Sequence, residues 1–208
     1  MNEWYEQELY DSVRQIASTV LGMQLPIIVA VTGPTCSGKT TLAEALAKDP
    51  FIKGHLTETI RYDDYRRNAD DPMMPRYEGK LVYDHPQSYH GSEFTSHVID
   101  LMLGRNVASP TYDTATNRRC TAKRPIRAPK ILIAEGLFVF EMVKHLTARS
   151  LLVYLDVSEE ECLRRRIERD TRLYAVTDRQ VEEAFRTRVW PIWQPFGKRQ
   201  KAMAEIIL

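Results

Sequence analysis

The chain has 208 residues, of which 43% are hydrophobic and 27% are charged, as expected for one globular α/β domain of ordinary size. Its 29 basic and 28 acidic residues give a net charge of +1, which excludes a strong overall attraction to nucleic acid or membranes. Three widely spaced cysteines form no zinc or disulfide pattern, and the acidic N-terminus is not a targeting signal, so we expect a cytoplasmic protein.

The predicted elements alternate between helices and strands along most of the chain. An N-terminal amphipathic helix that ends at Gly22 is predicted by apolar residues at spacings of three and four: Tyr5, Leu9, Val13, Ile16 and Val20. Continuous apolar runs predict buried strands at 26–31, 59–63, 130–136, 151–156 and 205–208. Helical patterns lie between them, at 39–48, 92–104, 158–171 and 178–189. This alternation predicts a parallel sheet covered by helices on both faces.

The segment from about 64 to 128 does not follow this alternation simply. It is rich in Pro, Tyr, Arg and Asp, and residues 109–124 are typical of a hairpin. Because a long excursion from a compact sheet is usually functional, we expect a substrate-binding insertion here. The interpretation is a single domain, residues 1–208, with this insertion.

A phosphate-binding motif follows the first predicted strand. Residues 33–40, GPTCSGKT, match the pattern G-x-x-x-x-G-K-[ST], and a predicted helix follows. Glycines let backbone N–H groups approach phosphate oxygens, and the helix N-terminus adds partial positive charge. Lys39 is expected to reach the β- and γ-phosphates, and the Thr40 hydroxyl to bind Mg²⁺. The predicted nucleotide-binding residues are Gly33, Thr35, Cys36, Ser37, Gly38, Lys39, Thr40 and Thr41.

Two charged segments favour a small-molecule kinase over other nucleotide-binding classes. A regulatory GTPase would carry D-x-x-G and N-K-x-D strings, and neither occurs. Such a kinase needs an acidic residue near the acceptor hydroxyl and arginines around the phosphates. RYDDYRR places Asp63 and Asp64 at the end of a predicted strand, and CLRRRIERD carries three arginines on one helix: Arg165, Arg166 and Arg169. A solvated turn and a solvated helix face remain the alternative interpretations.

Four further segments carry a family resemblance, at 83–94 (YDHPQSYHGSEF), 103–119 (LGRNVASPTYDTATNRR), 131–140 (ILIAEGLFVF) and 164–170 (RRRIERD). In this order and spacing, with the phosphate loop, they resemble the uridine kinase and phosphoribulokinase family of P-loop small-molecule kinases. The resemblance covers roughly residues 25–208. It implies a P-loop NTPase fold with a five-stranded, mostly parallel sheet, a substrate-binding hairpin, an arginine lid at about 158–177, use of ATP and Mg²⁺, and possible homo-oligomers.

The resemblance also implies catalytic roles. Asp63 would lie beside the acceptor 5′-hydroxyl, with Tyr65 at the aromatic substrate-binding position of the same motif. Asp63 and Glu135 would join Thr40 around Mg²⁺. The residues expected to act on the transferring phosphate are Lys39, Arg166 and Arg169.

On the substrate side, the resemblance implies that Asp84 binds the ribose hydroxyls and that the hairpin contributes Tyr112, Asn117 and Arg119. The sequence departs from the family's pyrimidine kinases at Asn117, where they carry histidine, at Thr114, where they carry an aromatic residue, and at 174–176, where they carry R-G-R.

Uridine or cytidine is the expected acceptor. Nicotinamide riboside or another small hydroxylated metabolite is one alternative, because SEEECLRRR and RVWPIW resemble nicotinamide riboside kinases, and an inactive nucleotide-binding regulatory protein is another.

Overall fold

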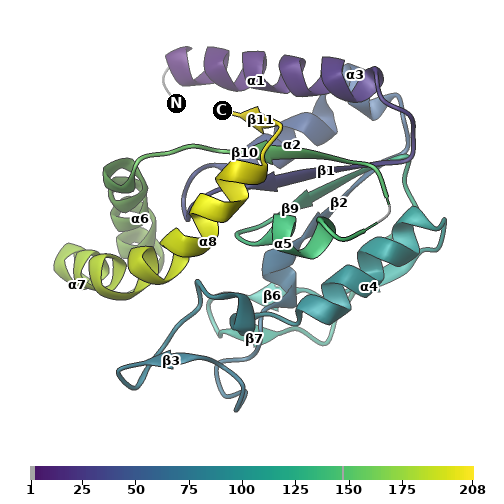
Figure 1. Ribbon diagram of the computed structural model, residues 1–208. Helices are drawn as coiled ribbons and strands as arrows, with labels where there is room; N and C mark the ends of the chain where they lie inside the picture. Colours follow the sequence, from purple (N-terminus) through teal and green to yellow (C-terminus); the bar gives the residue numbers. More distant parts are fainter. Residues whose placement is uncertain (1–2, 147) are drawn as a thin grey trace.

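The computed structural model describes residues 3–146 and 148–208, with side chains from residue 6 onward. A five-stranded sheet lies at its centre in the order β11-β10-β1-β9-β2, and all four strand pairings are parallel (Figure 1). The strands are β1 (Ile27–Thr32), β2 (Thr57–Arg61), β9 (Ile131–Glu135), β10 (Ser150–Tyr154) and β11 (Ile206–Ile207). The predicted five-stranded α/β fold is confirmed.

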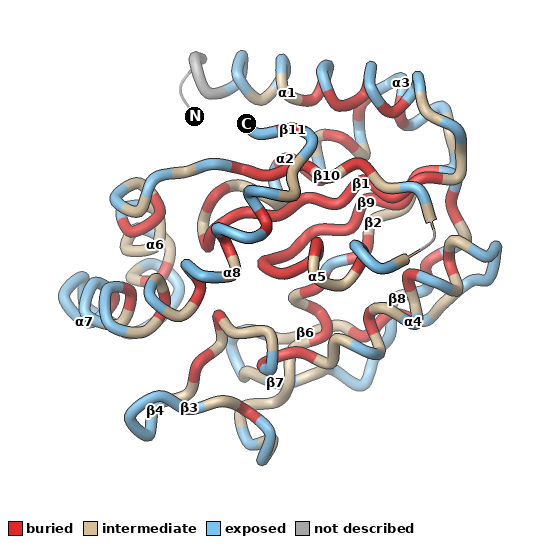
Figure 2. The backbone as a smooth tube through the Cα atoms, viewed as in Figure 1, coloured by how far each residue is buried: buried red, intermediate tan, exposed pale blue. Residues whose placement is uncertain are grey.

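Helices cover both faces of the sheet, as the continuous apolar strands require. In β1, Ile27, Val29 and Val31 face one hydrophobic cluster, whereas Ile28 and Ala30 face the other, because successive side chains of a strand point to opposite faces. The first face is covered by α1 (Glu3–Leu21), α2 (Lys39–Lys48) and the short α3 (Pro50–Lys53). The second is covered by α4 (Gly91–Met102), α5 (Val139–Val143) and α8 (Trp190–Met203). Figure 2 shows the buried strands between these layers.

Helix α1 ends at Leu21, directly before the glycine that was predicted to terminate it. Its buried residues, Val13, Ile16, Ala17 and Val20, pack in the same cluster as Leu42 and Leu46 of α2. Burying four apolar side chains contributes on the order of several kcal/mol, so α1 is an integral layer of the fold. The side chain of Tyr5 lies outside the described residues.

The segment between β2 and β9 forms short ladders around α4. A 3₁₀ turn, η1 (Tyr62–Tyr65), leaves β2 and is followed by the hairpin of β3 (Arg76–Tyr77) and β4 (Lys80–Leu81) and by the 3₁₀ turn η2 (Pro86–Ser88). After α4, the strands β5 (Val107–Ser109) and β8 (Arg124–Ile126) pair in antiparallel fashion. Within their loop, β6 (Tyr112–Asp113) pairs with β7 (Arg118–Arg119), which confirms the predicted hairpin.

The C-terminal region is more helical than the sequence predicted. Helix α6 (Glu159–Leu173) begins after its cap Ser158, and α7 (Asp178–Ala184) after its cap Thr177. A π-helical segment, η3 (Phe185–Val189), then continues into α8. The expectation that the helix ends at 189 was wrong: Pro191 lies in the first turn of α8, where its missing N–H costs little, and Pro195 is accepted inside the helix.

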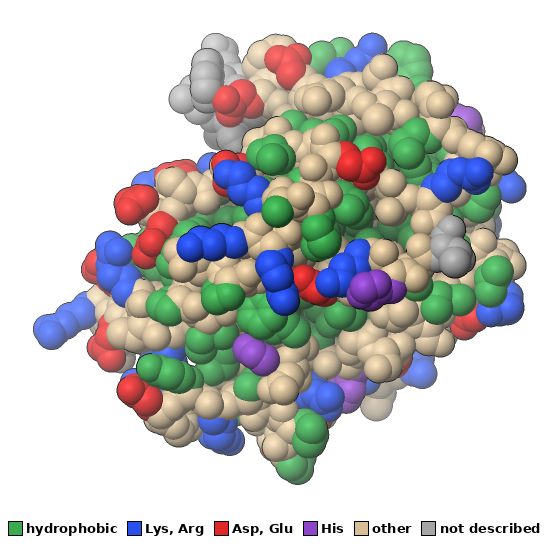
Figure 3. Space-filling model, viewed as in Figure 1, with side chains coloured by type: hydrophobic (Ala, Val, Ile, Leu, Met, Phe, Trp, Pro, Cys, Tyr) green, Lys and Arg blue, Asp and Glu red, His purple; other side chains and the backbone are tan. Residues whose placement is uncertain are grey.

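Charges of both signs are interspersed over the face of the molecule in Figure 3, in keeping with the nearly balanced composition. None of the helices in the described part of the chain is both long and apolar enough to cross a bilayer.

A close contact inside α8 gives a stability prediction. The Trp193 indole, itself buried, lies over Gly197, and a Cβ atom at that position would overlap the ring. Overpacking of this kind costs about 1–3 kcal/mol, so we expect Gly197→Ala to lower the free energy of unfolding by that amount in a urea titration. Gly54→Ala is the matched control, because a Cβ there meets its nearest atoms at an ordinary 3.6 Å. Equal stability of the two variants would contradict the packing argument.

Candidate active site

The predicted phosphate loop connects β1 to α2, and Lys39 is the first residue of that helix. Its ammonium donates to the carbonyl oxygen of Pro34 at 2.6 Å and to Oγ of Ser37 at 3.4 Å. Loss of solvent around the amine lowers the pKa of Lys39, while the charges of Glu135 and Asp63 oppose that shift. The ammonium therefore lies against the loop, and its contact with nucleotide phosphates stays a prediction.

Glu135 lies at the C-terminal end of β9 and is only 3% exposed. Its Oε1 accepts a hydrogen bond from the Thr40 hydroxyl at 3.1 Å and lies 3.4 Å from Nε of Arg61. Burial raises the pKa of Glu135, and the neighbouring Asp63 carboxylate adds to this, against the opposing charges of Lys39 and Arg61. The structure therefore brings together two of the residues predicted around Mg²⁺.

Gly136 allows this strand end to approach the neighbouring turn. The residue has φ of 155°, and a Cβ atom there would lie 2.5 Å from Cβ of Tyr62. No side chain fits at that distance, so the Glu-Gly pair is explained by packing of the β9 end against η1.

The donor set fits magnesium. Mg²⁺ prefers oxygen ligands, and kinase sites hold it through one or two carboxylates together with substrate phosphates. The Thr40 hydroxyl and the Glu135 carboxylate are such oxygens, at the helix that follows the phosphate loop. Among the side chains that the structure describes, residues 6–146 and 148–208, no three His, Cys, Asp or Glu side chains gather in a way that could hold a metal ion. Thr40 and Glu135 are the side chains that would hold a magnesium ion here.

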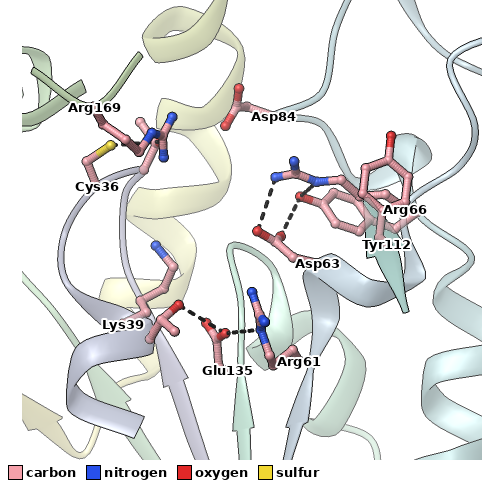
Figure 4. A network of polar contacts seen from close by, with 12 residues as sticks. Cys36, Lys39, Arg61, Asp63, Arg66, Asp84, Tyr112, Glu135 and Arg169 are labelled. Carbon is pink, nitrogen blue, oxygen red and sulfur yellow. Dashed lines mark hydrogen bonds and ion pairs between the residues drawn. The ribbon is translucent and has the colours of Figure 1, made fainter. Parts of the chain in front are cut away.

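Asp63 lies in η1, just beyond the end of β2. Its Oδ2 is 3.2 Å from Nη2 of Arg66, and its Oδ1 accepts a hydrogen bond from the Tyr89 hydroxyl, also at 3.2 Å. Burial opposes ionisation of this carboxyl, but the charges of Arg66, Lys39 and Arg61 outweigh it and lower the pKa of Asp63. Figure 4 shows Asp63 across the cleft from Lys39.

The predicted lid helix, α6, lies over the phosphate loop. Arg166 connects three parts of the site: its Nη1 lies 3.1 Å from Oγ1 of Thr35 and 3.4 Å from Oδ2 of Asp84, and its Nε lies 3.3 Å from Oδ2 of Asp170. Arg169 also pairs with Asp170, at 2.7 Å. The helix thus carries guanidinium groups to the phosphate loop and to the carboxylate predicted to bind ribose.

Between these elements lies a cleft of about 690 Å³, large enough for small ligands. Its walls include many of the predicted residues, namely Thr35, Cys36, Gly38, Lys39, Thr40, Thr41, Asp63, Asp84, Asn117, Glu135, Arg166 and Arg169. The predicted loop residues Gly33 and Ser37 are buried beside it. Residues separated by more than 100 positions in the sequence therefore face one space, at the C-terminal edge of the parallel strands, where open α/β sheets bind ligands.

The other predicted substrate residues lie at differing distances from this cleft. Asn117 lines it, at the turn of the β6–β7 hairpin. Tyr112 is half-buried and donates its hydroxyl hydrogen bond to the backbone oxygen of Arg67 at 3.3 Å. Arg119 pairs with Glu93 of α4 at 2.8 Å. These two side chains hold the hairpin against the rest of the insertion, and their roles toward a substrate stay predictions.

Tyr65 requires a correction. Its side chain is completely buried, packs edge-on against Phe94 and lies with its hydroxyl 2.7 Å from Nδ1 of His97. It is therefore a core residue rather than part of the cleft wall. The cause is the geometry of η1: with about three residues per turn, Asp63 and Arg66 share the cleft side, and Tyr65 points to the core.

Several cleft residues were not predicted: Arg61, Arg66, Tyr83, Asp170 and Tyr174. A signal for Arg66 was present, because it stands three residues after Asp63 in a short turn. For Tyr89, which contacts Asp63 from 26 residues away, no local pattern could reveal the contact.

A phosphate loop, a hydrogen-bonded threonine–glutamate pair and an arginine helix over one cleft are the features of a P-loop phosphotransferase. The sequence model of the Phosphoribulokinase / Uridine kinase family matches residues 28–208. The chain belongs to this family and is an ATP-dependent kinase.

Known relatives agree with this assignment. The chain is 27% identical to a uridine kinase of Leuconostoc citreum over 184 residues, 88% of this chain and 87% of the relative. It is 30% identical to a uridine kinase of Mycoplasma genitalium over 182 residues, 88% and 84% of the two chains.

Solved structures share the fold at lower identity. A possible uridine kinase from Bacillus stearothermophilus is similar with a TM-score of 0.70 at 18% identity, over 97% of this chain and 99% of that one. A D-glycerate 3-kinase from Cryptococcus neoformans is similar with a TM-score of 0.60 at 15% identity, over 89% of each chain. At these identities the likeness concerns the fold alone.

The lowered pKa of Asp63 predicts a pH-dependent stability contribution. Its ionised form stabilises the folded chain above the unfolded pKa of about 3.9, and this contribution is lost as the pH falls through the lower folded pKa. We therefore expect the thermal midpoint of Asp63→Asn to lie below that of the unaltered chain at pH 7. The difference between the two midpoints should narrow as the pH falls below about 4. A gap that is independent of pH in thermal unfolding would contradict the charge pairing.

Proposed function

We propose that the chain transfers the γ-phosphoryl group of ATP to the 5′-hydroxyl of a ribonucleoside, with uridine or cytidine as acceptor. The observation that carries this proposal is the position of Arg166, which contacts Thr35 of the phosphate loop at 3.1 Å and Asp84 at 3.4 Å. A nucleotide at the loop and a diol at Asp84 would therefore share one cleft, with Asp63 beside them. The relatives that are uridine kinases support this acceptor class.

On the nucleotide side, Lys39 and the amides of the phosphate loop would hold the triphosphate. Thr40 and Glu135 would hold Mg²⁺, which when bound neutralises charge on the phosphate oxygens. Arg166 and Arg169 would lie over the transferring group and help exclude water, which limits hydrolysis of ATP.

On the acceptor side, Asp63 would accept a hydrogen bond from the reacting hydroxyl and orient its oxygen for in-line attack. The lowered pKa of Asp63 favours this role, because the carboxylate is ionised at neutral pH and can accept. Asp84 would bind the vicinal ribose hydroxyls through its two oxygens.

A different acceptor is the second candidate. Thr114, Asn117 and Tyr174 line the cleft, and these are positions at which the sequence departs from pyrimidine kinases of the family. The altered lining weakens the case for uridine in particular, and it is the observation behind the second candidate, nicotinamide riboside or another hydroxylated metabolite. The cytoplasm is the proposed compartment in either case, in keeping with three free thiols at Cys36, Cys120 and Cys162.

The first experiment measures ADP release from Mg-ATP with a panel of acceptors and identifies products by mass. The panel contains uridine, cytidine, nicotinamide riboside, ribulose 5-phosphate, glycerate and pantothenate. We expect a phosphorylated product from uridine or cytidine. Product from another acceptor alone would overturn the acceptor class and leave the kinase. Tight ATP binding without any product would favour a regulatory protein.

Asp63→Asn tests the proposed chemistry. Removing an oriented carboxylate should lower kcat by about 100-fold or more, while the dissociation constant for ATP changes little. Asp64→Asn is the matched control, because Asp64 is the adjacent carboxylate, is 7% exposed and lies outside the cleft wall. We expect this control to keep its turnover. Full turnover in Asp63→Asn would remove Asp63 from the reaction.

A further inference from the structure

The carboxylate of Asp63 is held at both oxygens. Tyr89 donates to Oδ1 at 3.2 Å, and Nη2 of Arg66 donates to Oδ2 at 3.2 Å. Nε of Arg66 also donates to the Tyr89 hydroxyl at 3.3 Å, which closes a triangle of three side chains. The terminal torsion of an aspartate is broad, and the Asp63 side chain is 40% exposed, so without these donors its orientation would vary.

The Tyr89 ring is rigidly placed. It is 2% exposed and stacks on the ring of Tyr62 with centroids 4.4 Å apart and planes 10° from parallel. The edge of Phe138 lies against it at 5.9 Å. The phenolic hydroxyl is therefore a fixed donor, because the ring that carries it is packed in the hydrophobic core beside Asp63.

The backbone holds the same two residues together. Arg66 and Tyr89 form an isolated antiparallel bridge. On either side of it, the Arg67 N–H donates to the oxygen of Ser88 at 2.9 Å, and the His90 N–H donates to the oxygen of Tyr65 at 2.8 Å. The turn that follows β2 is thus tied to the segment that follows Asp84, and the side chains at this junction both point to Asp63.

We propose that Arg66 and Tyr89 are positioning residues, which fix the Asp63 carboxylate in one orientation toward the acceptor hydroxyl. This inference rests on the proposed function, in which Asp63 orients the acceptor. An ionised carboxylate offers about four acceptor positions, so one donor on each oxygen leaves further positions for the hydroxyl. Figure 4 shows Asp63 between Arg66 and the open space that it shares with Lys39. We call Arg66 and Tyr89 the clamp. The clamp acts by alignment, because in-line attack requires the reacting atoms to lie within a narrow range of distance and direction.

Tyr89→Phe removes one hydroxyl from this clamp and keeps the ring. With uridine and Mg-ATP, we expect kcat to fall about 10- to 100-fold, as for a small misplacement of a reacting group, with the KM for ATP unchanged. Arg66→Met should act in the same direction. Tyr62→Phe is the matched control: it removes a buried hydroxyl from the same aromatic stack, but that hydroxyl contacts Sδ of Met142 at 3.5 Å rather than Asp63. The control should keep its turnover and thermal midpoint.

A double substitution separates positioning from a general structural effect. In single-turnover assays, Tyr89→Phe should cause no further loss when it is added to Asp63→Asn, because the carboxylate that it orients is gone. An equal loss in both backgrounds would overturn the inference, as would wild-type turnover in both Tyr89→Phe and Arg66→Met. If those two variants stay active while Asp63→Asn is inactive, only the clamp fails. Full turnover in Asp63→Asn, or failure of the unaltered chain to phosphorylate uridine and cytidine, overturns the proposed function and the clamp with it.

Discussion

The cleft depends on the register of three neighbouring parallel strands. Glu135, the last residue of β9, stands opposite Val31 of β1 on one side and Arg61 of β2 on the other. Parallel strands lie about 4.8 Å apart, so three chain segments leave the sheet side by side at one edge. They are the phosphate loop, the Glu135–Gly136 turn and the 3₁₀ turn with Asp63. A shift of one residue in any strand would turn its side chains to the opposite face and separate the loop from the carboxylates.

At this edge, the pKa values of two nearby carboxyl groups are shifted in opposite directions. Glu135 is nearly inaccessible to solvent, so burial dominates and raises its pKa. Asp63 lies nearer the opening and is surrounded by the charges of Arg66, Lys39 and Arg61, which together lower its pKa. Environments that give neighbouring carboxyl groups different pKa values are a common feature of sites where such groups perform separate tasks. Asp84 is placed differently again, because its partner Arg166 belongs to the helix above the loop.

Local patterns in the sequence were sufficient for the individual strands, the phosphate loop and the hairpin, because each depends on residues close together in the chain. These patterns failed where tertiary packing determines which side chains are buried and where a helix ends. Nothing local shows that Tyr65 belongs to the core or that the hydroxyl of Tyr89, far along the chain, contacts Asp63. The expected helix ended at 189, yet burial of Trp193 and packing of Phe196 accompany a helix that continues beyond that residue. Arg66 could have been found from its spacing, whereas the contacts of Arg166 with Thr35 and Asp84 depend on where α6 docks.

The bridge between Arg66 and Tyr89 has a consequence for the size of molecule that the cleft can accept. One segment of this bridge follows Asp63, and the other follows Asp84, so backbone hydrogen bonds tie together the two segments that carry these carboxylates. In the proposed roles, one carboxylate meets the reacting hydroxyl and the other meets a diol. A molecule whose diol stands at a different separation from that hydroxyl could satisfy only one of them. The chain would then select substrates by the distance between their reacting hydroxyl and their diol, whatever group they carry elsewhere.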